Sequence, residues 1–126
     1  MKNNNLTSKT KKPQIYTQSF AVIYQCYLAK AKKKNRTKLE VDIILCWLTG
    51  YSQIELETQI KKEISFEAFF DQAPKLNPNQ KLIRGRICGI KSEEITQETM
   101  REIRYLDKLI DELAQGKTME QILPKK

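Results

Sequence analysis

The sequence predicts an all-α fold, a compact bundle of five to six short helices with angled packing. Apolar residues recur three and four positions apart along most of the chain, which is the spacing of one helix face. The breaks between these stretches are two to six residues long, as in helical bundles. Side chains that cap helix N-termini precede five of them: Thr37, Ser52, Ser65, Asn77 and Thr118.

The size and composition predict one domain behind a tail. With 126 residues and 40% apolar content, the chain can fill a core without a disulfide or a metal. Residues 1–13 hold one large apolar residue, Leu6, among asparagines, lysines and threonines, so we expect a disordered basic tail. We expect residues 14–126 to form a single helical domain.

The first two expected helices flank a lysine-rich segment. The first follows Ser19 and has one apolar face, made by Phe20, Ile23, Tyr24, Tyr27, Leu28 and Ala31. The second starts at a capping box, because Thr37 can accept from the amide of Glu40, and it ends at Gly50, a residue suited to a left-handed terminus. Residues 43–48 are all apolar, so we expect this helix to be central and covered on several sides.

The third and fourth expected helices are short. Ser52 and Glu55 repeat the capping signal, and the inward residues of the third helix are Leu56, Ile60 and Ile64. Ser65 begins the fourth helix, which stops before Pro74 because a residue that precedes proline avoids the helical region. Its aromatic stripe consists of Phe66, Phe69, Phe70 and Ala73.

The fifth expected helix begins at Asn77, an N-cap followed by a proline at the first helical position. Residues 83–90 within it are ambiguous, because two glycines weaken a helix and β-branched residues also suit a strand. We favour a helix there, with a short extended segment as the alternative.

A long helix is expected from about Gln97 to Gln115, ended by Gly116, and Thr118 caps a last turn through Leu123. The apolar stripe of the long helix consists of Met100, Ile103, Leu106, Leu109, Ile110 and Leu113. We interpret its acidic residues as solvated helix faces, partly paired with basic neighbours; they are Glu98, Glu102, Asp107, Asp111 and Glu112.

Most catalytic chemistry is excluded by residue types. The sequence has no histidine, which removes the commonest general base and metal ligand. Its three cysteines, Cys26, Cys46 and Cys88, form no Cys-x-x-Cys pair, so zinc-ribbon and thioredoxin-like sites are excluded. We therefore expect no cofactor, no metal and no catalytic residue, and we favour a protein that is not an enzyme.

The same features indicate where the protein resides. An odd number of widely spaced cysteines indicates a reducing compartment. The first residues lack the apolar run of a signal peptide, and the longest apolar run, residues 43–48, is too short to span a membrane. We expect a cytoplasmic protein without membrane contact.

Eight sequence blocks carry a resemblance to a known family: Tyr16–Phe20, Tyr27–Ala31, Arg36–Asp42, Trp47–Ser52, Phe66–Phe70, Ala73–Pro78, Cys88–Gly89 and Glu102–Leu113. Together they resemble the bacterial domain-of-unknown-function family 2200. The similarity extends from about Ile15 to Leu123, which is nearly the whole chain apart from the tail. The resemblance implies a small, mainly helical bacterial domain and supplies no functional residues, because the family has no established activity.

The charge distribution supplies the first candidate site. The net charge is +8, yet residues 1–13 carry four lysines and residues 30–38 carry six cations, so the rest of the chain is slightly acidic. The candidate polyanion-binding residues are Lys30, Lys32, Lys33, Lys34, Arg36, Lys38, Arg84 and Arg86. A structural interpretation competes, because cations at the end of a helix interact favourably with its dipole.

Other binding motifs are weaker. Residues 37–63 have the spacing of a helix-turn-helix, but the second helix would present Glu55 and Glu57 to DNA, so a plain helical hairpin is favoured. Residues 87–90 resemble half of a helix-hairpin-helix motif. Tyr16 and Tyr51 are candidate exposed aromatics for stacking on a base or a partner protein, with packing at a helix end as the alternative.

Two functions follow as hypotheses. The favoured one is a non-catalytic helical interaction or binding module, whose partner is another protein or a second copy. The alternative is an accessory nucleic-acid or polyanion binder that uses the basic run and the N-terminal tail.

Overall fold

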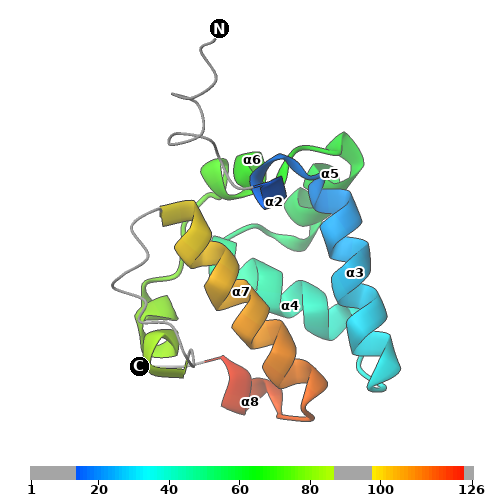
Figure 1. The fold of residues 1–126 in the computed structure, drawn as a ribbon, viewed down its shortest axis with the longest axis vertical. Coiled ribbons are helices and arrows are strands. Elements are labelled where there is room, and N and C mark those ends of the chain that lie inside the picture. The colour runs from blue at the N-terminus through cyan, green and yellow to red at the C-terminus, as the bar shows by residue number, and fades with distance from the viewer. Residues whose placement is uncertain (1–13, 87–97, 124–126) are drawn as a thin grey trace, which may run out of the picture.

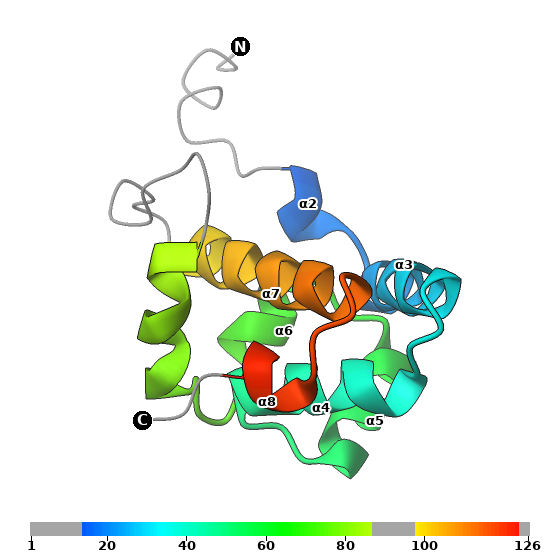
Figure 2. The same cartoon turned by 90° about the horizontal axis from the view of Figure 1, so that it is seen from below.

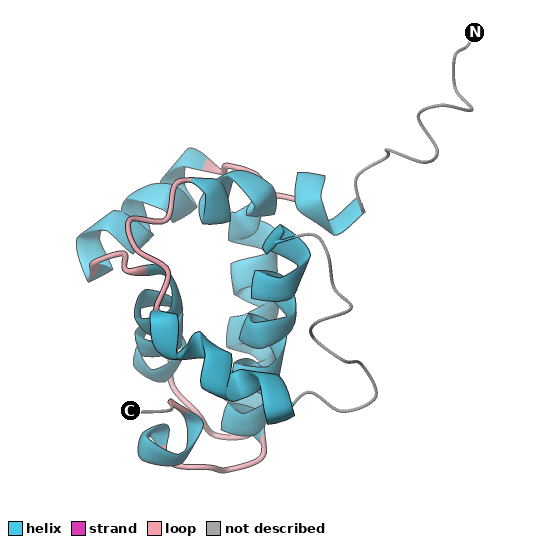
Figure 3. Cartoon of the chain, turned by 90° about the vertical axis from the view of Figure 1, so that its left-hand side faces the viewer, coloured by secondary structure: helices cyan, strands magenta, loops and turns pink. Residues whose placement is uncertain are grey.

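The computed structural model describes residues 14–86 and 98–123, and every regular element in these ranges is helical (Figure 3). The expected all-α fold is therefore confirmed. The expected basic tail, Cys88 and the motif at residues 87–90 lie outside the described residues. The helices are α2 (Gln14–Thr17), α3 (Phe20–Lys33), α4 (Lys38–Thr49), α5 (Gln53–Lys62), α6 (Phe66–Asp71), the 3-10 helix η1 (Pro78–Arg86), α7 (Glu98–Ala114) and α8 (Met119–Ile122).

The long helix α7 organises the bundle. It packs against α3, α4, α6, η1 and α8, as Figures 1 and 2 show. Its apolar stripe is buried as expected, with Ile103, Leu106, Leu109, Ile110 and Leu113 each at most 1% exposed. Because partners approach from several directions, more than one face of α7 is covered.

The helix ends match the capping signals. Thr37, Ser52 and Thr118 each form a complete capping box, and the Ser65 hydroxyl accepts from the amide of Ala68 at 3.1 Å. The Asn77 side chain accepts from the amide of Asn79 at 2.8 Å and so begins η1. Local side-chain chemistry thus set these boundaries independently of tertiary packing.

The ambiguous segment after Asn77 is helical where it is described. Residues 83–86 belong to η1, so the favoured helix is confirmed there, although it is a 3-10 helix instead of an α-helix. Ile83 is fully buried and anchors η1.

An aromatic cluster joins the first half of the chain. The ring of Phe20 stacks on Phe69 with centroids 3.8 Å apart and an interplanar angle of 10°. The starts of α3 and α6 are also joined by backbone hydrogen bonds, from the amide of Phe20 to the carbonyl of Ile64 and from Phe66 to Gln18, both 2.8 Å. The short helix α2, which the sequence pattern did not predict, adds the buried side chain of Tyr16.

The segment after α6 closes the C-terminal end of α4. The amides of Lys75 and Asn77 donate to the carbonyls of Thr49 and Leu48, both at 3.0 Å, and the Asn77 side-chain amide donates to Trp47 at 3.2 Å. These bonds satisfy helix-end carbonyls that have no partner within α4. They also hold residues 73–77 in place beside the start of α7.

Candidate functional site

Three cations of the basic run have carboxylate partners. Lys30 pairs with Asp111 of α7, and Lys38 donates to Asp42 within α4 at 2.7 Å. Arg36 binds Glu40 and also donates to backbone carbonyls at the end of α7. Lys30 and Arg36 therefore join α7 to the segment around the end of α3, whereas the ion pair of Lys38 lies within α4.

The other candidate polyanion-binding residues lie in two separate parts of the structure. Lys32, Lys33 and Lys34 are exposed at the C-terminal end of α3. Arg84 and Arg86 belong to η1, and this element lies on the opposite side of the bundle from α3 in both Figure 1 and Figure 2. The backbone thus does not bring the two halves of the candidate set onto one surface.

Several acidic residues are not solvated, contrary to expectation. Glu102 and Glu112 are 3% and 1% exposed, so the interpretation of these side chains as solvated helix faces was wrong. Glu112 has Lys108 and Lys117 within 4 Å. Asp107 accepts from the Tyr27 hydroxyl at 2.9 Å, and burial raises the pKa of both groups. The reason for the error is that α7 is covered on more faces than its apolar stripe indicates.

Asp42 is a second buried carboxylate, and its role is structural. It accepts from the Tyr24 hydroxyl at 2.6 Å, from Lys38 at 2.7 Å and from the Gln53 amide at 2.8 Å. Burial and the neighbouring Asp42 raise the pKa of Tyr24 to about 12. A carboxylate with three donors from α3, α4 and α5 is fully engaged in holding these helices together.

The expectation that Tyr16 and Tyr51 are exposed was also wrong. Tyr16 and Tyr51 are each 4% exposed, and the Tyr51 hydroxyl donates to the carbonyl of Phe69 at 2.6 Å. Both rings belong to the core: Tyr16 is the buried residue of α2, and the ring centroid of Tyr51 lies 4.9 Å from that of Phe69 in α6. Neither ring is available for stacking on a base.

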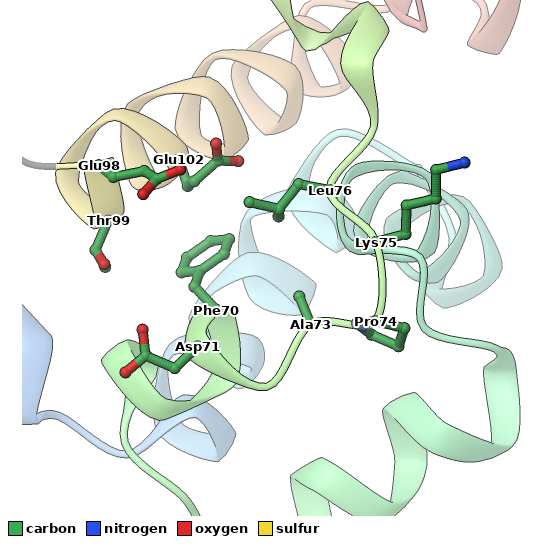
Figure 4. Close-up of a pocket in the computed structure, with 9 residues that line it drawn as sticks. All are labelled: Phe70, Asp71, Ala73, Pro74, Lys75, Leu76, Glu98, Thr99 and Glu102. Atoms are coloured by element: carbon green, nitrogen blue, oxygen red, sulfur yellow. The ribbon is translucent and has the colours of Figure 1, made fainter.

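A pocket of about 350 Å³ opens between α6, the segment after it and the first turns of α7. In Figure 4, Glu98, Thr99 and Glu102 of α7 stand across from Phe70 and Asp71 of α6. The apolar part of the wall consists of Phe70, Ala73, Pro74 and Leu76. The volume lies within the range of small-ligand sites, and the mixture of an apolar wall with a few polar groups is typical of them.

Glu102 is the buried polar group of this pocket. The side-chain amide of Gln80, from η1, donates to its carboxyl group. Its Oε1 atom is buried without a hydrogen-bond partner in the described structure, and the same holds for Oε1 of Gln80. Burial, opposed by the Gln80 hydrogen bond and assisted by the charge of Glu98, raises the pKa of Glu102 to about 7. Near neutral pH this carboxyl is therefore poised between its two protonation states.

The charge of the pocket is negative. Among the described residues of its wall, Asp71, Glu98 and Glu102 contribute carboxyl groups, and Lys75 directs its ammonium away from them in Figure 4. Among the described residues, no three His, Cys, Asp or Glu side chains lie close enough together to hold a metal ion. None of the described helices has the length and apolar character needed to cross a membrane.

The sequence contained one signal for this site. Glu102 precedes Leu106, Leu109 and Leu113 by four, seven and eleven positions, so it occupies an inward position of the apolar stripe. An acid at such a position is a candidate for burial. The pocket itself could not be predicted, because its two walls are more than twenty residues apart in the sequence.

Comparisons with known proteins agree with the fold. A family model described as "Uncharacterized protein conserved in bacteria (DUF2200)" matches residues 14–124. Among solved structures, the crystal structure of uncharacterized protein SP1917 has 38% sequence identity and a TM-score of 0.81, and the similarity covers 90% of this chain and 93% of that chain. No curated protein matches the chain.

Proposed function

The chain belongs to the bacterial family DUF2200, and we propose that it is a non-catalytic binding module whose ligand site is the pocket between α6 and α7. One observation supports this proposal: the wall of an open pocket of ligand size contains the buried carboxyl group of Glu102, one oxygen of which has no hydrogen-bond partner among the described residues. A buried polar atom without a partner costs free energy, and a ligand that supplies the missing donor recovers it.

We assign a binding role instead of a catalytic one because of the residue types. The whole sequence lacks histidine, and the pocket combines carboxylates with Thr99 and an apolar wall. We place this module in the bacterial cytoplasm as a single domain over residues 14–126. The free thiols of Cys26 and Cys46 suit a reducing compartment.

The test is an NMR titration of ¹⁵N-labelled protein with a small-molecule library of mixed charge. We expect at least one compound to shift the amides of Ala73, Leu76 and Thr99 saturably. Thr99→Tyr, which fills the pocket, should abolish this response, whereas Gln25→Tyr at an exposed position of α3 should retain it. Compounds that shift only amides elsewhere, or bind equally to the Thr99 variant, would contradict the proposal.

Polyanion binding is the second candidate function. It is supported by three adjacent exposed lysines, Lys32, Lys33 and Lys34, and it is weakened by the carboxylate partners of Lys30, Arg36 and Lys38. Binding to DNA and RNA is measured over a salt series, with the full chain and with residues 1–13 deleted. Replacing the three lysines by glutamine should lower the salt slope by up to about three if all contact phosphates. Affinity that is independent of salt would refute this function.

A further inference from the structure

Two buried acceptors lie together where α7 meets η1. Gln80 donates its amide to the Glu102 carboxyl, which leaves Oε1 of each side chain without a donor in the part of the chain that the structure describes. Glu102 is 3% exposed and lines the pocket. Of the two side chains only Glu102 lines the pocket, so what this corner lacks is a hydrogen-bond donor to the Glu102 carboxyl.

The charges around the pocket favour a ligand group with a positive charge. Asp71 and Glu98 are exposed at the pocket rim, and Lys75 extends away from them. An anion would meet repulsion from the carboxylates, whereas a cation would be attracted by them. A primary ammonium carries three donors and a positive charge, so it satisfies both requirements.

The apolar wall of the pocket favours a ligand whose charged group is attached to an apolar stem. Phe70, Ala73, Pro74 and Leu76 form one side of the pocket, opposite the acidic turn of α7. An aliphatic stem that packs on this wall gains from the burial of its methylene groups. A bare inorganic cation would leave the wall unused.

We propose that the pocket binds a primary ammonium on an aliphatic stem, with the Glu102 carboxylate as its counter-ion. This inference rests on the proposed function, since it names the ligand class of the same site. The last side-chain torsion of glutamate is soft, so the Glu102 carboxyl can turn toward a ligand in the pocket. The ammonium comes either from a free amine or from the side chain of a lysine in a partner protein.

Binding is coupled to a proton. Burial raises the pKa of Glu102 to about 7 although the hydrogen bond from Gln80 lowers it. The charge of Glu98 raises this pKa further, and the charge of Arg101 lowers it. Among the residues of the pocket wall that the structure describes, the remaining charged groups are Asp71 and Lys75. Only the ionised carboxyl pairs with an ammonium, so the ligand displaces the proton and its affinity rises with pH. From pH 6 to pH 8 the ionised fraction, and with it the affinity, increases about tenfold.

The experiment titrates the full chain with n-butylammonium, n-butanol and butyrate, and follows the amides of Leu76 and Thr99 by NMR. We expect saturable shifts with n-butylammonium, at least tenfold weaker binding of n-butanol, and no binding of butyrate. Glu102→Gln should weaken n-butylammonium binding at least tenfold, while Glu120→Gln, an exposed acid of α8, should leave it unchanged. Lysine with an acetylated α-amino group and an amidated carboxyl group separates the two sources. If it binds as tightly as n-butylammonium, the ligand is a lysine of a partner protein, and if it binds more weakly, the ligand is a free amine.

The outcomes also separate this inference from the proposed function. If n-butanol binds in the pocket as tightly as n-butylammonium, the ligand class is wrong and the binding module stands. If n-butylammonium affinity does not rise between pH 6 and pH 8, Glu102 is not the counter-ion, and this result needs no variant that must fold. If none of the three probes and no library compound shifts the pocket amides, the proposed function fails as well.

Discussion

The guanidinium of Arg36 binds both carboxylate oxygens of Glu40, with Nε 3.1 Å from Oε1 and Nη2 2.8 Å from Oε2. Its Nη1 atom donates to the carbonyls of Leu113 and Lys117 at 3.2 and 2.9 Å. One side chain thus joins the start of α4 to the end of α7. The Arg36 hydrogen bond is also the main reason that the pKa of Glu40 is lowered to about 2.

This arrangement predicts that the basic run contains two kinds of residue. Arg36→Gln should lower the free energy of unfolding by about 2 to 3 kcal/mol, because charge-assisted hydrogen bonds are lost at both helix ends. Lys33→Gln, at an exposed position a few residues away, should change it by less than about 0.5 kcal/mol. Urea denaturation measures both. Equal effects would show that Arg36 is an ordinary surface cation.

The end of α4 gives a second prediction. Gly50 has a φ of +82°, and a Cβ atom there would lie 2.6 Å from the carbonyl oxygen and 2.8 Å from the amide nitrogen of Lys75. Gly50→Ala should therefore add a backbone clash to the strain of a left-handed residue and cost about 3 kcal/mol or more. Gly116 is the matched control, since its φ is +94° and nothing lies within 4 Å of its Cβ position. Gly116→Ala should cost only about 1 kcal/mol, and thermal unfolding that ranks the two variants equally would contradict this account.

The burial of Glu102 predicts a pH dependence of stability. Its pKa is raised from 4.5 to about 7 on folding, chiefly by burial, so the folded protein holds the proton more tightly than the unfolded chain does. The resulting stability is fully present below about pH 4.5 and is lost as the pH rises through 7, by about 3 kcal/mol in total. Glu102→Gln should remove this dependence.

The measurement compares urea unfolding of the wild-type protein and the Glu102→Gln variant at pH 5 and pH 8. The difference between the two proteins isolates Glu102 from other groups such as Asp107, whose pKa is also raised. The variant should gain about 2 to 3 kcal/mol relative to the wild type between these pH values. A constant difference would mean that Glu102 titrates normally in the folded protein.

The helix boundaries could be predicted from the sequence because they depend on neighbours in the chain. Thr37 caps its helix through Glu40, three residues away, and Ser52 does the same through Glu55. The left-handed conformation of Gly50 follows from the same local logic. Its close approach to Lys75 does not, since that contact depends on how residues 73–77 cross the end of α4.

The candidate site could not be predicted because it depends on tertiary packing. The sequence shows an excess of cations in residues 30–38. It does not show that Lys30, Arg36 and Lys38 form ion pairs with carboxylates in the folded protein. Conversely, the position of Glu102 on the apolar stripe makes it a candidate for burial, but only the packing of α7 against α6 and η1 places it in the wall of a pocket. The spacing of apolar residues shows which face of a helix is suited to burial. Which of its side chains are in fact buried depends on how the other helices pack against it.

The most direct test of the pocket is the titration of the Glu102 carboxyl carbon, followed by ¹³C NMR with and without n-butylammonium. We expect a midpoint near pH 7 in the free protein, and a lower midpoint as the amine saturates the pocket, because the bound ammonium favours the ionised carboxyl. A midpoint near the ordinary value of about 4.5, unchanged by the amine, would contradict the claim that Glu102 is a buried counter-ion awaiting a cationic ligand.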